Sequence, residues 1–475
     1  MKILLIYPTD LISPDLLPHV GYAIYFRVNY PPTNLGYLAS YLENAGHKVK
    51  ISDCAVEKYN LDDIKQEIKH FNPDVVGITS NTQLIYGAMA IAKITKEINP
   101  NCLTIVGGSH VTYMAVESLT ECPYIDVAVR GEGEETIYEL LEKKREKWKD
   151  VRGITFRYNG KIIHNPDRGF IENLDEIPFP AYHLMPMKKY VAYGQLVDSW
   201  AHGQPFGGVL TSRGCPYNCA FCASKTLGKK WRIRSPENII DEVRLLVDKY
   251  KRREIEFLDD SFTINEKRTE EICKLIRKEG LDISWFCSTR VDRFTKSMAH
   301  IMHNSGCHSV FFGIESGDQE ILNFLNKGFD LERAEQSVKI AKKAGLNVIT
   351  FFIIGTPLDT KDKIWKTINF AKKLKPTFAL FNQLTPYPGT KIYEIAEEKN
   401  LFITKDWSKY ITMSSPVIRI PGVTHEELKM FLKKANFSFY FTPSYFFTTL
   451  REIIVSKNTS KIIVDHIKML VTSQY

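Results

Sequence analysis

Three cysteines lie within eight residues in the segment RGCPYNCAFCAS, residues 213–224. Cys215, Cys219 and Cys222 follow the spacing C-x3-C-x2-C, and the next cysteine downstream is Cys273. A structural zinc site uses four ligands, usually as two pairs, and a disulfide would leave one thiol over. A cubane cluster of four irons and four sulfides accepts three thiolates and keeps one iron free. The spacing therefore favours an iron–sulfur cluster with one open position over zinc or inert thiols.

The cysteine loop opens a series of six predicted strand–helix units. The helical pattern at residues 236–250 is one of the intervening helices. The predicted strands are residues 209–212, 254–259, 284–289, 309–315, 347–355 and 378–384. Six units are too few for a closed eight-stranded barrel and predict an open, partial barrel. Its functional residues are expected at the carboxyl ends of the strands.

The first 150 residues show the same alternation of short β-branched runs with amphipathic stretches. The predicted strands are residues 2–7, 49–52, 74–80, 103–108 and 126–131. Such alternation predicts a parallel sheet with helices on both faces, in a doubly wound, Rossmann-like α/β domain. Ligands of these sheets bind at the carboxyl ends of the strands. Here those ends carry Thr79-Ser80, Gly107-Gly108 and Gly131-Glu132-Gly133-Glu134.

Four segments are expected along the 475 residues, because one core rarely extends over so long a chain. They are the Rossmann-like domain at 1–150, a linker with a hairpin at 151–204, the partial barrel at 205–400, and a helical, aromatic-rich cap at 401–475. Asn159-Gly160 is the predicted hairpin turn. The aromatic residues of the cap favour core packing, with an apolar channel or a membrane interface as the alternatives.

Composition indicates the kind of ligand and the cellular compartment but does not identify a substrate. The net charge of +8 fits an anionic ligand, a membrane surface or RNA. Six of the nine cysteines are scattered singly, which indicates reduced thiols and a cytoplasmic location. The apolar start of MKILLIYPTD is too short for a signal peptide, and no apolar run reaches the roughly 18 residues of a membrane-spanning helix.

The cysteine motif, with Phe221 before its last cysteine and at the start of a six-unit barrel, resembles the radical S-adenosylmethionine (SAM) superfamily. The resemblance extends over about residues 205–400. It implies a 4Fe-4S cluster on Cys215, Cys219 and Cys222, whose free iron binds the amine and carboxylate of SAM. It also implies cleavage of SAM by one electron, from a donor such as a flavodoxin or ferredoxin. The resulting 5′-deoxyadenosyl radical would abstract hydrogen from an unactivated C–H bond.

The resemblance further implies SAM contacts at Phe221 and at Ser288, which lies near the end of the third strand. Asp260, in a DD-x-F segment where the family often has Gly-Gly-Glu, would receive the SAM ammonium. The alternative is that Asp260 or Ser261 caps the following helix.

Three charged side chains complete the predicted SAM site. Arg290 would pair with the SAM carboxylate or neutralise Asp292. Glu315 ends the fourth strand and would contact SAM or form a structural ion pair. Lys327 would reach the SAM carboxylate or remain a solvated lysine at a helix end.

The phrases PPTNLGYLASYLENAGHKV, DVVGITS, IVGGSHVT and VRGEGEETIYEL resemble a cobalamin-binding domain. It is the domain of the radical SAM class that includes methylases and the anaerobic magnesium-protoporphyrin cyclase. The resemblance implies a corrin on the strand ends and a buried dimethylbenzimidazole tail. The implied cobalamin contacts are Thr79, Ser80, Gly107, Gly108, Glu132 and Gly133.

One departure from mutase-type cobalamin domains concerns the ligand of cobalt. Those domains supply a histidine from D-x-H-x-x-G, whereas SDCAVEKYN at residues 52–60 contains none. We therefore expect cobalt without a histidine from that motif. The alternative is a sheet that has lost the cofactor.

The leading hypothesis is an enzyme that methylates, cyclises or otherwise modifies a C–H position of a bulky apolar substrate such as a lipid or tetrapyrrole. Peripheral membrane contact is compatible with it, and nucleic acid is not an expected partner. A first alternative is a radical SAM enzyme like the tRNA methylthiotransferases, with Cys54, Cys102 and Cys122 on a second cluster. A second is a non-catalytic iron–sulfur redox or sensor module.

Overall fold

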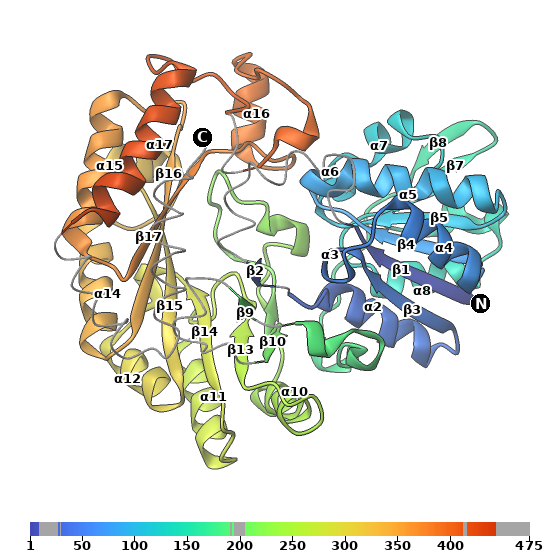
Figure 1. Ribbon diagram of the computed structural model, residues 1–475, viewed down its shortest axis with the longest axis horizontal. Helices are drawn as coiled ribbons and strands as arrows, with labels where there is room; N and C mark the ends of the chain where they lie inside the picture. The colour runs from blue at the N-terminus through green and yellow to red at the C-terminus, as the bar shows by residue number, and fades with distance from the viewer. Residues whose placement is uncertain (9–26, 29, 191, 194–204, 412–415, 443–475) are drawn as a thin grey trace.

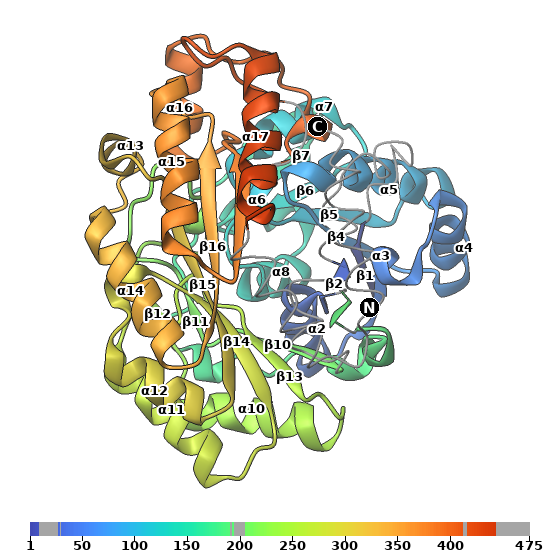
Figure 2. The ribbon, with the colours of Figure 1, turned by 60° about the vertical axis from the view of Figure 1, so that its left-hand side comes forward.

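The structure is a computed structural model that describes residues 1–8, 27–28, 30–190, 192–193, 205–411 and 416–442. Two α/β units lie side by side: in Figure 1 the N-terminal unit runs from blue to cyan, and the barrel from green through yellow to orange. Figure 2 shows the same two units after a 60° turn. The expected fold class, a Rossmann-like domain followed by a partial barrel, is confirmed.

The N-terminal sheet has seven strands in the order β3-β1-β4-β5-β6-β7-β8, of which the first five are parallel. Alternate side chains of β1 enter different cores, since Leu5 packs with helices α2 and α8, and Leu4 with α4 and α5. The parallel strands are β3 (Lys48–Asp53), β1 (Lys2–Tyr7), β4 (Val75–Thr79), β5 (Leu103–Gly107) and β6 (Val127–Val129). The covering helices are α2 (Thr33–Asn44), α8 (Glu134–Glu142), α4 (Leu61–Phe71) and α5 (Ile85–Ile98).

The predicted hairpin belongs to this sheet and is not a linker element. Strands β7 (Ile154–Tyr158) and β8 (Lys161–His164) flank Asn159 and Gly160, whose φ angles of 48° and 74° suit a tight hairpin turn. β7 pairs antiparallel with β6, and this pairing buries Phe156 against the N-terminal core.

The second sheet has six strands in chain order, all parallel, and its edges are β10 and β17. An open, partial barrel was predicted from the number of units. The strands are β10 (Phe206–Val209), β13 (Glu254–Phe257), β14 (Ser284–Thr289), β15 (Cys307–Glu315), β16 (Asn347–Ile354) and β17 (Phe378–Gln383). Its helices include α10 (Pro236–Asp248), α11 (Glu266–Lys278), α12 (Lys296–Asn304), α14 (Leu331–Lys343) and α15 (Lys361–Leu374).

The first barrel strand was predicted at residues 209–212, which is wrong. β10 ends at Val209, and a short strand β11 (Ser212–Arg213) pairs antiparallel with β12 (Arg232–Ile233). Glycine occupies position 208 of β10 because a Cβ there would approach the Leu258 side chain to 2.8 Å. Since glycine has low strand propensity, the residue types did not predict that the strand begins at Phe206.

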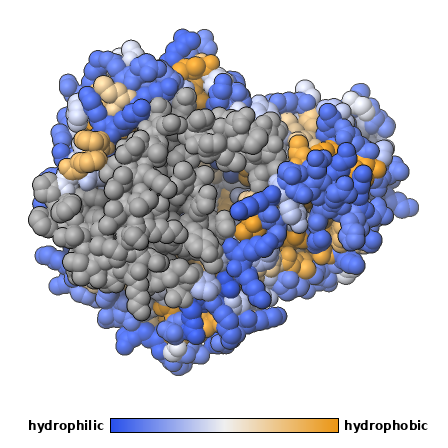
Figure 3. Space-filling model, in the orientation of Figure 1, coloured by the Kyte–Doolittle hydropathy of each residue, from blue (hydrophilic) through white to orange (hydrophobic). Residues whose placement is uncertain are grey.

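The C-terminal region that the structure describes is helical, with α16 (Lys391–Glu398) and α17 (His425–Tyr440). The Tyr440 hydroxyl donates to the Ala379 carbonyl of β17 at 2.8 Å, whereas Phe437 and Phe441 stack on each other at the surface. Other aromatic residues of the predicted cap, Tyr445, Phe446 and Phe447, lie outside the described residues. On the face shown in Figure 3 the described surface is mostly hydrophilic. None of the described helices is both long and apolar enough to cross a membrane.

Candidate functional site

The three motif cysteines line one cavity of about 190 Å³ at the carboxyl ends of the barrel strands. This cysteine cavity also contains every side chain that was predicted to contact SAM. They are Phe221, Asp260, Ser288, Arg290, Glu315 and Lys327. Residues up to 136 positions apart in the sequence thus meet at the site where the strands of the barrel end.

Backbone contacts hold the cysteine loop in place. Gly214 has a φ of +84°, and a Cβ there would lie 2.4 Å from the Lys230 carbonyl oxygen, so only glycine fits. The Cys215 amide donates to the Gly228 carbonyl at 3.2 Å, and the Ala220 amide donates to the Leu325 carbonyl at 2.9 Å. The loop is therefore bound both to its own return segment and to the segment after α13 (Gln319–Phe324).

The donor set fits a cluster with an open corner. Burial raises the pKa of the Cys215 and Cys222 thiols, so a metal must displace their protons. The cavity lining holds no fourth cysteine and no histidine. Within the described ranges, no three candidate ligands converge on a single metal ion. A cubane places its thiolate ligands on separate irons, so this arrangement suits it and does not suit mononuclear zinc.

Glu315 and Lys327 form a buried ion pair in the cysteine cavity, with Oε1 and Nζ 3.0 Å apart. Glu315 adopts a φ of 74° where the pairing of β15 with β16 shifts register, a conformation that is rare outside glycine. A Cβ at Gly313 would lie 2.5 Å from Glu315 Oε1, so glycine leaves room for the pair. Lys327 is thus a buried cavity residue and not a solvated lysine at a helix end.

Arg290 contacts a motif cysteine and an acidic neighbour together. Its Nη1 lies 3.6 Å from Cys219 Sγ, and its Nε donates to Asp292 at 2.9 Å. The guanidinium lies 3.7 Å from the centre of the Tyr217 ring. Arg290 therefore neutralises Asp292, the alternative considered from sequence, while its charge remains at the edge of the cysteine cavity.

The two aspartates after β13 have different roles. Asp259 is buried and accepts hydrogen bonds from the amide of Thr211 and its hydroxyl, the latter at 2.8 Å. The side chain of Asp260 is accessible from the cysteine cavity, and the surrounding protein together with Asp259 raises its pKa to about 6. Neither caps the next helix, since the Asn265 side chain caps α11. A carboxyl aimed into the cavity remains free for a ligand.

A second cavity, of about 260 Å³, lies at the strand ends of the N-terminal sheet, next to α2 and α8. We call it the cobalamin cavity, after the cofactor predicted to bind at these strand ends. It is lined by five of the six residues predicted to contact cobalamin: Thr79, Gly107, Gly108, Glu132 and Gly133. A Cβ at Gly131 would meet nothing within 4 Å, and one at Gly107 would meet only the Val129 carbonyl oxygen at 3.9 Å. Side chains at these positions would fill the cavity, so the glycines keep open a cradle that fits the predicted cofactor.

Ser80 and Glu132, two of the predicted cobalamin contacts, have protein partners in the structure. The buried Ser80 hydroxyl donates to the Asn81 carbonyl at 2.9 Å, and Ser80 is not part of the cavity lining. Glu132 borders the cavity, but its carboxylate is held by Arg213 and Arg232. Asn34, which sequence reasoning missed, lines the cavity and donates to the Thr79 hydroxyl at 3.0 Å.

The loop after β3, where mutase-type domains carry the cobalt-binding histidine, has no histidine here. Its Asp53 caps the short helix α3 (Cys54–Glu57) by accepting from the amides of Ala55 and Val56. His110 is buried, contacts Thr82 Oγ1 at 3.2 Å, and packs edge-to-face on Trp407. Burial lowers its pKa to about 4, so its imidazole is neutral.

A third cavity, of about 190 Å³, is lined by both units. Ser109 and Gln83 come from the N-terminal unit, and Ala223 and Tyr387 from the barrel. Since Ala223 directly follows Cys222, this interdomain cavity joins the strand ends of the first sheet to the cysteine loop. Asn81 and Gln83 also were missed from sequence, where only their position after a strand could have indicated them.

The three cysteines proposed for a second cluster do not form a metal site. Cys54, Cys102 and Cys122 are buried in the apolar core beneath α4 and α5. Burial raises the pKa of Cys54 to about 12 and that of Cys102 to about 11, values that disfavour thiolates. No group of metal ligands that includes them occurs in the described part of the chain.

Comparisons with known proteins agree with this geometry. The family model of the radical SAM superfamily matches residues 209–371, and that of the B12 binding domain matches residues 20–141. An uncharacterized methyltransferase of Pyrococcus horikoshii is 44% identical over 93% of each chain. The anaerobic magnesium-protoporphyrin IX monomethyl ester cyclase of Rubrivivax gelatinosus is 28% identical over 87% of this chain and 76% of its own.

The fold also matches that of a solved structure. The cobalamin-dependent S-adenosylmethionine radical enzyme OxsB, with aqua-cobalamin and S-adenosylmethionine bound, superposes with a TM-score of 0.73 at 18% identity. The match covers 100% of this chain and 71% of that one.

Proposed function

This chain belongs to the radical SAM superfamily, in the class with a B12-binding domain before the barrel, and on that premise we propose that it transfers a methyl group to carbon in a bulky, largely apolar small molecule. It is an enzyme, and its cofactors are a 4Fe-4S cluster, SAM and cobalamin. The observation that carries the proposal is the interdomain cavity, because its lining joins the cobalamin side to the cysteine loop.

Different residues of the chain would bind the iron–sulfur cluster and SAM. Cys215, Cys219 and Cys222 would hold the cluster, and Asp260 and Lys327 would bind the ammonium and carboxylate of SAM by charge-assisted hydrogen bonds. When bound, these groups supply radical chemistry at an unactivated C–H bond and a carrier for the methyl group. The protein would hold them in a fixed mutual orientation.

Methyl transfer is favoured over cyclisation by the degree of similarity to the two kinds of relative. The Pyrococcus horikoshii protein, called a methyltransferase, is 44% identical, whereas the Rubrivivax gelatinosus cyclase is 28% identical. Cyclisation remains the second candidate, because the cyclase is similar over most of this chain.

A bulky apolar substrate suits the inner face of the barrel. Phe286, Phe311 and Phe351 follow one another with ring centres 5.3 and 6.0 Å apart, and the last two line the cysteine cavity. Aromatic walls favour lipids or planar macrocycles over strongly charged metabolites. We further propose that a flavodoxin or ferredoxin supplies the electron. The exposed pair Phe437 and Phe441 would support peripheral contact with a membrane if the substrate is a lipid.

The test is transfer of a labelled methyl group under anaerobic conditions. The reconstituted enzyme, with hydroxocobalamin, dithionite and SAM carrying a trideuteriomethyl group, is incubated with separate lipid and tetrapyrrole extracts. We expect mass spectrometry to detect products that have gained one trideuteriomethyl group. An unlabelled product that has lost two hydrogens would indicate cyclisation and contradict the proposal. Enzyme lacking the three cysteines is the control.

A further inference from the structure

Four buried charged residues link the cobalamin cavity to the base of the cysteine loop. Arg213 donates through Nη1 to Glu132 Oε1 at 2.9 Å and through Nη2 to Glu134 Oε1 at 2.7 Å. Arg232, which pairs with Arg213 across β11 and β12, donates to Glu132 Oε2 at 2.8 Å. We call these four residues the Arg–Glu cluster.

The Arg–Glu cluster is almost fully withdrawn from water. The side chains of Arg213, Glu132, Glu134 and Arg232 are between 2% and 8% exposed. Its two positive and two negative charges balance, and Glu132 Oε2 also accepts from the Ile171 amide at 2.7 Å. Removing one member of such a group leaves an uncompensated buried charge and is strongly destabilising.

The Arg–Glu cluster joins two predicted cofactor sites, because its glutamates line the cobalamin cavity and Arg213 lies next to the cysteine loop. Glu132 and Glu134 line the cobalamin cavity and lie on either side of Gly133. Arg213 lines the same cavity and precedes Cys215 by two residues, with only the constrained Gly214 between them. A shift of either loop must therefore move the other.

We propose that Arg213 is a positioning residue through which the iron–sulfur site on the cysteine loop and the cobalamin cavity stabilise each other. Loading of the iron–sulfur cluster fixes the cysteine loop, which fixes Arg213 and thereby the two glutamates at the edge of the cavity. Cobalamin then binds to a cavity that is already ordered. Coupling of this kind is reciprocal, so bound cobalamin also protects the cluster from loss.

The proposal rests on the two cofactors of the proposed function but not on the reaction, since it concerns binding alone. The test measures the dissociation constant of hydroxocobalamin by visible absorbance in the full chain, under anaerobic conditions. One sample carries the reconstituted cluster, and the other has had its iron removed by a chelator. Circular dichroism verifies that both samples are folded.

In the wild type we expect cobalamin to bind at least about fivefold more tightly when the cluster is present. Arg213→Lys keeps the charge but loses the two-pronged geometry of the guanidinium. In this variant the ratio of the cobalamin dissociation constants without and with the iron–sulfur cluster should fall to about one. Cluster-loaded Arg213→Lys should also release iron to the chelator at the same rate with and without cobalamin, whereas cobalamin should slow that loss in the wild type.

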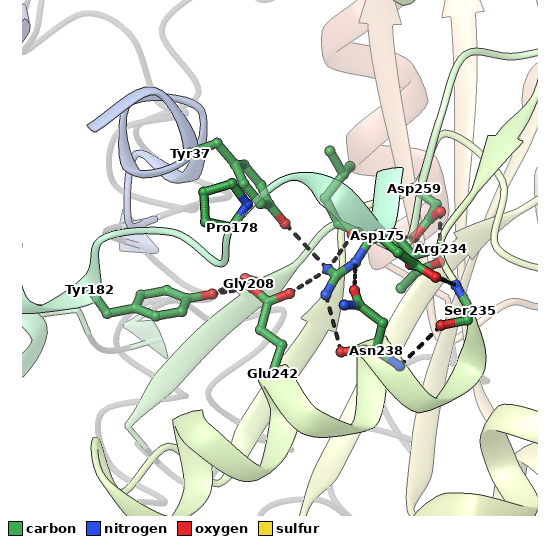
Figure 4. A network of polar contacts seen from close by, with 12 residues as sticks. Tyr37, Asp175, Pro178, Tyr182, Gly208, Arg234, Ser235, Asn238, Glu242 and Asp259 are labelled. Carbon is green, nitrogen blue, oxygen red and sulfur yellow. Dashed lines mark hydrogen bonds and ion pairs between the residues drawn. The ribbon is translucent and has the colours of Figure 1, made fainter. Parts of the chain in front are cut away.

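Arg234→Lys is the matched control. Arg234 is 5% exposed, pairs with the fully buried Glu242, and contacts the Tyr37 hydroxyl of the N-terminal unit at 3.3 Å. Figure 4 shows this network, in which the Tyr182 hydroxyl donates to Glu242. Arg234 lines no part of the cobalamin cavity. Arg234→Lys should lose about as much thermal stability as Arg213→Lys, but it should keep the wild-type ratio of cobalamin dissociation constants.

A wild-type ratio of one, or an Arg213→Lys ratio equal to that of the wild type, would overturn the proposal. If Arg213→Lys does not fold, Glu134→Gln decides the question, because it removes one charge from the Arg–Glu cluster without changing its shape. A reduced ratio in Glu134→Gln then supports the coupling, and an unchanged ratio refutes it. None of these outcomes depends on which substrate is modified.

Discussion

Lys327 Nζ lies 3.0 Å from Glu315 Oε1, and both side chains are buried in the cavity that contains the three motif cysteines. Glu315 has a strained backbone conformation, with a φ of 74°, and the pair depends on the missing side chain at Gly313. Backbone strain of this kind persists where the surroundings enforce it, commonly at ligand sites. The pair is thus placed to exchange its mutual contact for contacts with a zwitterionic ligand such as SAM.

Replacing Glu315 by glutamine is therefore expected to weaken SAM binding without removing the cluster. Loss of one charge-assisted hydrogen bond costs about 2 kcal/mol, or about thirtyfold in the dissociation constant. Equilibrium dialysis under anaerobic conditions measures it, and iron content verifies the cluster. Glu335→Gln is the control, because Glu335 pairs with the exposed Lys339 and Lys373 at the surface. Unchanged affinity in Glu315→Gln would remove Glu315 from the SAM site.

Filling the cobalamin cavity should abolish cobalamin binding selectively. A leucine at Gly107 would project into open space beside the Val129 carbonyl, where the cofactor is expected. We expect at least a tenfold weaker dissociation constant for hydroxocobalamin, with the cluster content and the melting temperature little changed. Gly169→Leu is the control, since Gly169 is exposed and a Cβ there has no neighbour within 4 Å. Equal binding by the two variants would place cobalamin elsewhere.

Asp260 should make SAM binding dependent on pH. The surrounding protein and Asp259 raise its pKa to about 6, so the carboxylate that we propose receives the SAM ammonium forms as the pH rises through that value. Wild-type affinity for SAM should increase over this range, and Asp260→Asn should give a flat and lower profile. Parallel profiles for the two proteins would contradict the assignment.

Glu256 should make the stability of the protein fall at high pH. It lies in β13, burial raises its pKa to about 7, and its Oε2 has no hydrogen-bond partner. The pKa of Glu256 is about 7 in the folded protein and about 4.5 in the unfolded chain. The protonated carboxyl therefore contributes its full stabilisation below about pH 4.5, and this contribution is lost as the pH rises through about 7. Differential scanning calorimetry should show Glu256→Gln melting above the wild type at pH 8 and close to it at pH 5. A wild type that stabilises over this interval would refute the expectation.

Local pattern was sufficient to predict most of the cysteine cavity. The spacing of Cys215, Cys219 and Cys222, and the positions of Asp260 and Glu315 after strand-like runs, place these residues at one end of a parallel sheet without any knowledge of distances. Parallel strands bring their carboxyl ends together, which makes this inference reliable.

Contacts between distant segments could not be predicted in the same way. The partner of Glu132 is Arg213, which lies 81 residues away in the other unit, and no local pattern links them. Glu132 was therefore predicted only as a cobalamin contact, and its ion pairs with Arg213 and Arg232 could not be predicted from sequence. The positive φ of Glu315 likewise depends on the register shift beside β16 and has no signature in the residue types.

The central claim, that three cysteines hold a cluster with one iron left for SAM, is tested most directly by 5′-deoxyadenosine formation. The anaerobically reconstituted chain is mixed with SAM and dithionite, and the product is quantified by liquid chromatography beside the iron and sulfide content. We predict about four irons and four sulfides per chain with product in the wild type, and neither in the variant with Cys215, Cys219 and Cys222 all replaced by alanine. Cleavage of SAM by that variant at the wild-type rate would contradict the account.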